Sequence, residues 1–192
     1  MLVATFDIGT TAVKAVAVRD DGELIFAGSQ VIHTIEKNGF KEQDPEEWYS
    51  AFCTLSHALT GKIPAQEISA LIFSGQMQDV IPVGSDRRAL GNAILYSDGR
   101  AGAQAETIEN AVGGDTITAI TGNHFDVSMP LAKILWLKEN EPEIYTQTTA
   151  FLISSKDYVV AKLTGNFIGD MTSCATAGAM DLEYKTWSQC LI

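Results

Sequence analysis

Cysteine and histidine are scarce in this chain of 192 residues, with three of each. The cysteines, at positions 53, 174 and 190, form an odd and widely spaced set that fits neither a disulfide framework nor a zinc site. The histidines are equally scattered, and none has the spacing of a metal ligand. A reducing compartment is therefore expected, and the cytoplasm is the predicted location.

Positive charge is also in short supply. Thirteen Lys and Arg residues stand against 24 Asp and Glu, which leaves a formal net charge of −11. This balance disfavours a nucleic-acid backbone or an anionic membrane surface as a partner. No basic stretch precedes the first apolar run, and no run approaches the roughly eighteen apolar residues that span a membrane. An anionic substrate would then need backbone amides, a cation or a metal to hold it.

Two common nucleotide-binding signatures are missing. The chain has neither a G-x-x-x-x-G-K-[ST] segment nor a G-x-G-x-x-G segment after a strand, which excludes P-loop and Rossmann sites. Any phosphate site must therefore be built from another kind of turn.

The order of the predicted elements indicates one α/β domain. Apolar runs over residues 2–8, 12–18 and 24–31 are separated by short polar turns and predict an antiparallel three-stranded meander. Asp44-Pro45 begins a helix that Gly61 ends. Further strands are expected over residues 68–73, 80–83 and 93–96, and helices over residues 100–112, 130–139, 141–146 and 155–163.

The first polar cluster lies in the turn between the first two strands. Asp7 is at the end of a buried strand, where a carboxylate is costly unless a cation such as hydrated magnesium compensates it. Gly9 allows a tight turn, and Thr10 and Thr11 offer amides and hydroxyls to a phosphate, with Lys14 three residues on. An ordinary polar hairpin, with Asp7 capping the turn, is the alternative.

Two further polar clusters follow strands. Residues 74–79 (SGQMQD) come directly after an apolar strand, and their amides can hydrogen-bond sugar hydroxyls in both directions. A plain strand-ending turn is the alternative there. Asp98 stands at the start of a predicted helix, where it is expected to cap that helix or to accept from a sugar hydroxyl, and the two roles are compatible. If Asp98 is only a cap, the neighbouring Arg100 is expected to be a solvated charge.

Taken in order, these segments resemble the FGGY family of carbohydrate kinases, and most of all its xylulokinase-like branch. The resemblance runs through nearly the whole chain. The matching segments are residues 6–11 (FDIGTT), 42–48 (EQDPEEW), 74–77 (SGQM), 93–100 (AILYSDGR), 121–123 (TGN), 132–136 (AKILW), 141–144 (EPEI), 156–158 (KDY), 163–165 (LTG) and 170–173 (DMTS), ahead of Asp181-Leu182. One such motif would be weak evidence, whereas the series in register is specific.

The resemblance implies an actin-like, ribonuclease H-like α/β fold, with a mixed β-sheet and flanking helices, in a kinase whose two domains flank a cleft. Residues 1–192 would be the N-terminal domain in incomplete form, and ATP with Mg²⁺ would phosphorylate a sugar hydroxyl. The resemblance assigns Asp7 to magnesium, four residues to the phosphates of ATP and four to the sugar. The phosphate residues are Gly9, Thr10, Thr11 and Lys14, and the sugar residues are Gln76, Met77, Gln78 and Asp98.

Departures from the family pattern narrow this interpretation. Gln78 stands where the xylulokinase-like branch usually has histidine, and the Arg-Glu pair of the glycerol kinase branch is missing. The expected substrate is therefore a xylulose-like ketose, gluconate or a related polyol, with glycerol disfavoured. No Gly-Asp-Asn or Gly-Asp-Gln segment occurs, so the general base is expected beyond Ile192 and the fragment alone is expected to be inactive.

Two other functions fit the same residues. One is a non-catalytic module that binds or senses a sugar, and the other is an actin-like or chaperone-like ATPase that needs no sugar. The expected partners are a small sugar and ATP, with no nucleic acid and no membrane. Self-association as a homodimer is a further expectation.

Overall fold

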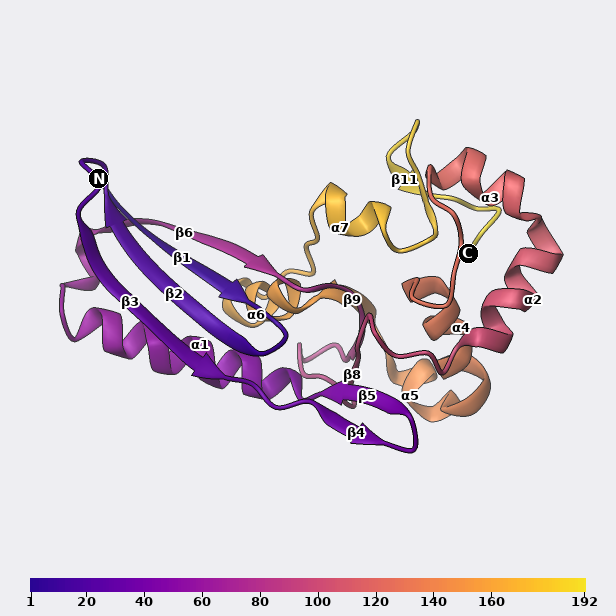
Figure 1. Ribbon diagram of the computed structural model, residues 1–192, viewed down its shortest axis with the longest axis horizontal. Helices are drawn as coiled ribbons and strands as arrows, with labels where there is room; N and C mark the ends of the chain where they lie inside the picture. Colours follow the sequence, from indigo (N-terminus) through magenta and orange to yellow (C-terminus); the bar gives the residue numbers. More distant parts are fainter.

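Alternating burial along the first strand builds the first sheet of the computed structural model, which describes residues 1–192. β1 (Leu2–Ile8) buries every second side chain, and β2 (Ala12–Arg19) and β3 (Leu24–Val31) follow as antiparallel neighbours. β6 (Ile68–Gly75) pairs with β1 in parallel, which gives the order β3-β2-β1-β6. The predicted meander is confirmed, and Figure 1 shows it at the amino-terminal end of an elongated molecule.

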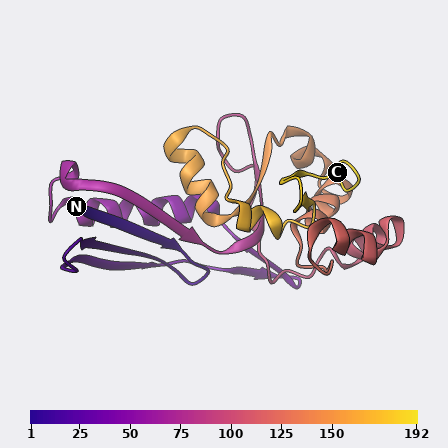
Figure 2. The ribbon, with the colours of Figure 1, turned by 90° about the horizontal axis from the view of Figure 1, so that it is seen from above.

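One long helix covers the buried face of this sheet. α1 (Pro45–Thr60) begins where predicted, because the Asp44 side chain accepts a hydrogen bond from the Glu46 amide at 2.9 Å. Phe52 of α1 packs against Phe6 of β1 with ring centroids 4.7 Å apart, and burial of one such side chain is worth roughly 1.5–3 kcal/mol. Figure 2 shows α1 along one side of the sheet. The exposed Asp7 lies on the other face.

A second sheet continues from the first. The chain passes from β6 through Gln76 directly into β7 (Met77–Val83). β7 is flanked by β8 (Ala93–Ile94) and β9 (Ala150–Ser154), and β8 leads to the hairpin of β5 (Phe40–Gln43) and β4 (Ile35–Lys37), in the order β4-β5-β8-β7-β9. Because β6 and β7 form one continuous path, the polar residues 74–79 lie where the two sheets meet.

Helices make up most of the remaining chain. They are α2 (Gly102–Val112), α3 (Gly114–Thr121), α4 (Pro130–Asn140), α5 (Pro142–Gln147), α6 (Ser155–Thr164) and α7 (Met171–Ala175), with the short turn η1 (Ala65–Glu67) before β6 and a small hairpin of β10 (Met180–Asp181) and β11 (Thr186–Trp187) near the carboxyl end. The four predicted helices are confirmed to within two residues at each end. None of the helices combines the length and apolar character needed to cross a lipid bilayer.

Several elements were not predicted from the sequence: the β4–β5 hairpin, the turn η1, α3, β9, α7 and the β10–β11 hairpin. The hairpin turns at Asn38 and Gly39, whose φ angles are 55° and 83°. Asn-Gly is a strong signal for such a turn, because both residues tolerate positive φ. β9 is a mostly apolar run of five residues between two helices, and the periodicity of such a short run does not distinguish a strand from a helix.

Candidate functional site

The turn between β1 and β2 holds the first group of predicted site residues. Its tightness comes from Gly9, whose amide donates to the Ala12 carbonyl at 3.2 Å. A Cβ on Gly9 would lie 3.0 Å from that same carbonyl oxygen, so the position favours glycine. Thr11 and Lys14 are exposed. The predicted phosphate residues therefore form a compact turn with accessible polar groups.

Asp7 lies beside this turn on the open face of the sheet. In register it stands opposite Lys14 on β2 and Ser74 on β6, and the Ser74 hydroxyl donates to Asp7 Oδ1 at 2.8 Å. No cluster of three or more acidic, histidine or cysteine side chains is found that would hold a metal by protein ligands alone. A single carboxylate still fits Mg²⁺, which keeps several waters and is commonly bound through one or two carboxylates and substrate phosphates.

Gln76 joins the turn to the second polar cluster. Its backbone N–H donates to the Ile8 carbonyl at 3.1 Å. Its side-chain Oε1 accepts from the Thr10 hydroxyl at 2.9 Å. The structure therefore brings Thr10 and Gln76, separated by 66 positions in sequence, into direct contact. Met77 and Gln78 are half-buried and continue from this contact along β7.

The start of α6 closes the same junction and was not singled out from the sequence. The Ser155 hydroxyl donates to the Ile8 carbonyl at 2.6 Å, and the Ser154 hydroxyl donates to the Gln76 carbonyl at 2.7 Å. Gly75 fits here because a Cβ would lie 2.5 Å from Ser155 Oγ and 2.9 Å from the Lys156 amide nitrogen. Three segments therefore meet in direct contact: the end of β1, the end of β6 and the start of α6.

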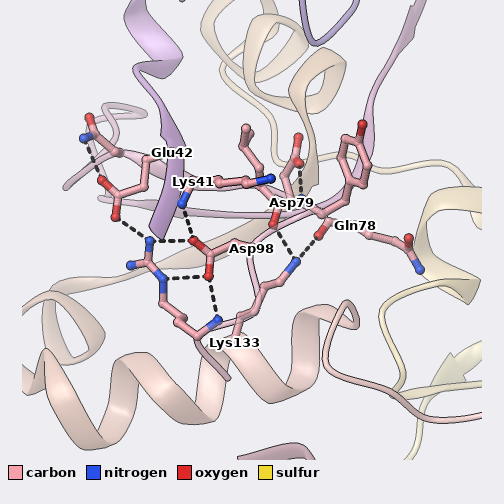
Figure 3. A network of polar contacts seen from close by, with 10 residues as sticks. Lys41, Glu42, Gln78, Asp79, Asp98 and Lys133 are labelled. Atoms are coloured by element: carbon pink, nitrogen blue, oxygen red, sulfur yellow. Dashed lines mark hydrogen bonds and ion pairs between the residues drawn. The ribbon is translucent and has the colours of Figure 1, made fainter. Parts of the chain in front are cut away.

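Lys133 of α4 joins the backbone at Gln78 to the backbone at Leu95, and Figure 3 shows its contact with Gln78. Its fully buried ammonium donates to the Gln78 carbonyl at 2.9 Å and to the Leu95 carbonyl at 2.8 Å. Gln78 has a φ of 64°, which is uncommon for a residue with a Cβ. The hydrogen bond from Lys133 helps to fix this conformation, and with it the direction in which the Gln78 side chain leaves the chain.

Asp79 lies next to this lysine and is also fully buried. Its Oδ1 accepts from the Tyr96 amide at 3.1 Å, while Oδ2 has no partner. Burial raises the pKa of Asp79 to about 7, although the Tyr96 hydrogen bond and the charge of Lys133 oppose the rise. Burial likewise lowers the pKa of Lys133 to about 8, against the opposing effect of Asp79. Sequence reasoning placed Asp79 in the cluster but gave no sign of Lys133.

Asp98 faces inward rather than toward the β1–β2 turn. Its carboxylate accepts from the Lys41 amide at 2.6 Å and pairs with Arg100 at 2.8 Å, and its side chain is 0% exposed. Burial alone would raise the pKa of Asp98, but the hydrogen bonds from Arg100 and the Lys41 amide outweigh it and lower that pKa. A sugar contact by Asp98 stays a prediction, and it would require this pair to open.

Arg100 is not the solvated charge that the sequence suggested. Its side chain is 2% exposed and also pairs with Glu42 at 2.7 Å. Its guanidinium lies over the rings of Phe40 and Trp136, 3.8 and 4.9 Å from their centroids. Asp98 does not cap α2 either, because the residue before that helix is Ala101 and makes no side-chain cap. Arg100 instead attaches the β4–β5 hairpin to α4.

An apolar hollow lies away from these residues. It has a volume of about 530 Å³ and an almost wholly apolar lining, which includes Leu131, Ile134 and Ile192. It contains none of the predicted site residues. Apolar walls offer no partners for sugar hydroxyls or phosphate oxygens, so the polar junction remains the candidate site.

Comparisons with known proteins identify the family to which the chain belongs. Residues 2–192 match the sequence profile of the FGGY family of carbohydrate kinases, N-terminal domain. Xylulose kinase from Bacillus subtilis is 33% identical over 189 residues, which are 97% of this chain and 38% of that protein. Ligand-bound xylulose kinase from Lactobacillus acidophilus has a TM-score of 0.90 at 31% identity, over 99% of this chain and 39% of the other.

Gluconate kinase from Lactobacillus acidophilus has a TM-score of 0.89 at 31% identity, over 100% of this chain and 39% of the other. The chain thus spans well under half the length of the proteins it matches. These sugar kinases have the actin-like α/β fold, so the predicted fold class is confirmed.

Proposed function

The chain belongs to the FGGY family of carbohydrate kinases, and from this membership we propose that the complete protein transfers the terminal phosphoryl group of ATP to a hydroxyl of a sugar. Residues 1–192 supply the N-terminal domain of this kinase in incomplete form. The observation that carries the proposal is the direct contact between the turn suited to phosphate and the segment suited to a sugar, made by Thr10 and Gln76 at 2.9 Å. Transfer requires the two substrates to meet at such a boundary.

The sugar is a xylulose-like ketose, gluconate or a related polyol. Matched proteins include both xylulose kinases and gluconate kinases at similar identity, which supports this class without selecting a member of it. Gln76 supports a polyhydroxy ligand, because after its internal contacts it retains one N–H and one lone pair. Met77, Gln78 and Asp98 complete the proposed sugar side.

Each polar group of the turn has a proposed role. The amides of Thr10 and Thr11, with the ammonium of Lys14, bind the phosphate oxygens and stabilise negative charge there, while Gly9 keeps the turn tight through its hydrogen bond to the Ala12 carbonyl. Asp7 holds hydrated Mg²⁺, which when bound neutralises phosphate charge. The base that removes the proton from the sugar hydroxyl comes from outside residues 1–192. This division explains why the chain alone is expected to be inactive.

The proposed surroundings follow from the same chemistry. ATP and a small sugar are the partners, and the cytoplasm is the location, in keeping with three free cysteines. Nucleic acid and membrane surfaces are not expected partners of a chain with a net charge of −11. A homodimer stays a prediction.

Asp7→Asn in the full-length protein tests the proposal. ADP release is measured with xylulose, gluconate and glycerol, and in the absence of any sugar. We expect sugar-dependent release from the unchanged protein and a kcat reduced by about 10²–10³-fold in the variant, the size found when one preorganised electrostatic group is removed.

Asp21→Asn is the matched control, because Asp21 also lies on the surface and only accepts from the Glu23 amide in a turn. It should retain full turnover. Sugar binding without ADP release would support the non-catalytic module instead. ADP release that ignores sugar would support an ATPase, and undiminished turnover in Asp7→Asn would refute the role of Asp7.

A further inference from the structure

Gln43, the last residue of β5, is fully buried and uses every hydrogen bond that its side chain can make. Its Nε2 donates to the Thr10 carbonyl at 2.7 Å and to the Thr34 hydroxyl at 2.9 Å. Its Oε1 accepts from the Trp48 indole at 3.0 Å and from Gln76 Nε2 at 2.7 Å. A primary amide offers two N–H groups and two lone pairs, so none is left over.

The directions of these hydrogen bonds are fixed by chemistry. An indole N–H only donates and a backbone carbonyl only accepts, so Trp48 and the Thr10 carbonyl together orient the amide of Gln43. Gln76 must then donate through Nε2, and its Oε1 is left to accept from the Thr10 hydroxyl. The proton of Thr10 is thereby committed to Gln76. The lone pairs that remain on the Thr10 hydroxyl oxygen can accept from a hydrogen-bond donor, but they cannot bind a phosphate oxygen, which is itself an acceptor.

The network is anchored in the core rather than at the surface. Trp48 is 0% exposed and belongs to α1, which packs on the first sheet. Gln43 is followed at once by the Asp44-Pro45 start of that helix. The position of Gln43 is therefore set by the buried core of the first sheet and α1, and its contacts carry that position to the turn and to Gln76.

We propose that Gln43 is a positioning residue for phosphoryl transfer, which rests on the function proposed above. By contacting both Thr10 and Gln76, it holds the phosphate turn and the sugar-side segment as one unit and sets which of their groups donate and which accept. Gln43 touches neither substrate. It acts through the two residues on either side of the reacting groups.

Gln43→Glu in the full-length protein is the test. The substitution keeps the size of the side chain and both contacts of Oε1, but it replaces the donor that faces the Thr10 carbonyl with an oxygen. We expect kcat to fall about 10²-fold, the effect of a displacement near 1 Å between reacting groups. We also expect faster hydrogen exchange in the peptide covering residues 8–13, measured by mass spectrometry without substrates.

Leu59→Ala separates positioning from stability. Leu59 is a buried residue near the end of α1, and none of the hydrogen bonds that define the site involves it. It should lower the melting temperature and leave kcat and the exchange of residues 8–13 unchanged. If Gln43→Glu does not fold, Trp48→Phe removes one hydrogen bond to Gln43 while keeping an aromatic ring, and kcat should fall several-fold.

The two proposals fail in different ways. If the protein without substitutions phosphorylates no sugar in the panel, the proposed function is refuted. The hydrogen exchange of residues 8–13 in Gln43→Glu then tests by itself whether Gln43 positions the turn. Unchanged kcat and unchanged exchange in folded Gln43→Glu overturn the positioning role. An equal loss of kcat in Leu59→Ala also overturns it, since the effect would then be general destabilisation.

Discussion

Replacing Asp79 with Asn should abolish one pH dependence of stability. Asp79 is fully buried with an unpartnered Oδ2, and its pKa of about 7 lies well above the ordinary value of 3.8. Between these two values the folded protein holds a proton that the unfolded chain has released. Stability contributed by this group is therefore present below about pH 4 and is lost as the pH rises through 7.

The size of the effect follows from the pKa. A pKa difference of one unit between the folded and unfolded states is worth about 1.4 kcal/mol. The difference between 3.8 and about 7 for Asp79 therefore sets an upper limit of roughly 4 kcal/mol on the change in stability between pH 4 and pH 7.5. Asn keeps the acceptor for the Tyr96 amide and has no proton to release. As the pH rises from 4.5 to 7.5, the free energy of unfolding of Asp79→Asn should therefore increase by on the order of 2 kcal/mol relative to that of the chain without the substitution.

Urea denaturation, followed by tryptophan fluorescence, to which the buried Trp48 contributes, measures both proteins at each pH. The difference between them reports Asp79 together with its coupling to Lys133, because the other carboxyl groups titrate alike in the two chains. Asp86→Asn is the control, since Asp86 is exposed and contacts only Arg88, through its amide at 3.1 Å and a loose ion pair at 3.9 Å. A difference that stays flat from pH 4.5 to 7.5, or that moves in the opposite direction, would refute the reasoning.

Two further substitutions test the packing around the site. Gly75→Ala should destabilise the chain by about 1–3 kcal/mol in urea, because its Cβ would lie 2.9 Å from a backbone nitrogen of α6 that has little freedom to move. Adding Ser155→Ala should restore only part of the loss, and full restoration would contradict the backbone contact. Arg100→Met should cost about 3–5 kcal/mol by leaving Asp98 buried and unpaired. A loss below 1 kcal/mol would show that Asp98 is solvated instead.

The β1–β3 meander and α1 could be predicted because their signals are local. The apolar run over residues 2–8 identifies β1 by itself, and Asp44-Pro45 identifies the start of α1 by itself. The same holds for the tight turn at Gly9. The β4–β5 hairpin was also within reach, since Asn38-Gly39 marks it, although its short strands carry little alternation.

The contacts that organise the site could not be predicted, because they join residues far apart in sequence. Thr10 meets Gln76 across 66 positions, and Lys133 meets Gln78 across 55. Lys133 sits in an amphipathic helix pattern, where a lysine ordinarily marks the solvated face. Arg100 was likewise predicted to be solvated, because a charged side chain ordinarily lies on the surface. Its burial depends on two aromatic rings and two carboxylates that only the folded chain brings around it.

The way Lys133 holds Gln78 bears on how substrate choice is set. Lys133 contacts the carbonyl of Gln78 and not its side chain, so this contact is the same for any residue at position 78. The same is true of Leu95, which contributes only its carbonyl. The backbone of the sugar-side segment is therefore fixed independently of the side chain that leaves it. In the proposed sugar site, Gln78 in place of the histidine usual in the xylulokinase-like branch would change which hydroxyls are bound without changing where the segment lies.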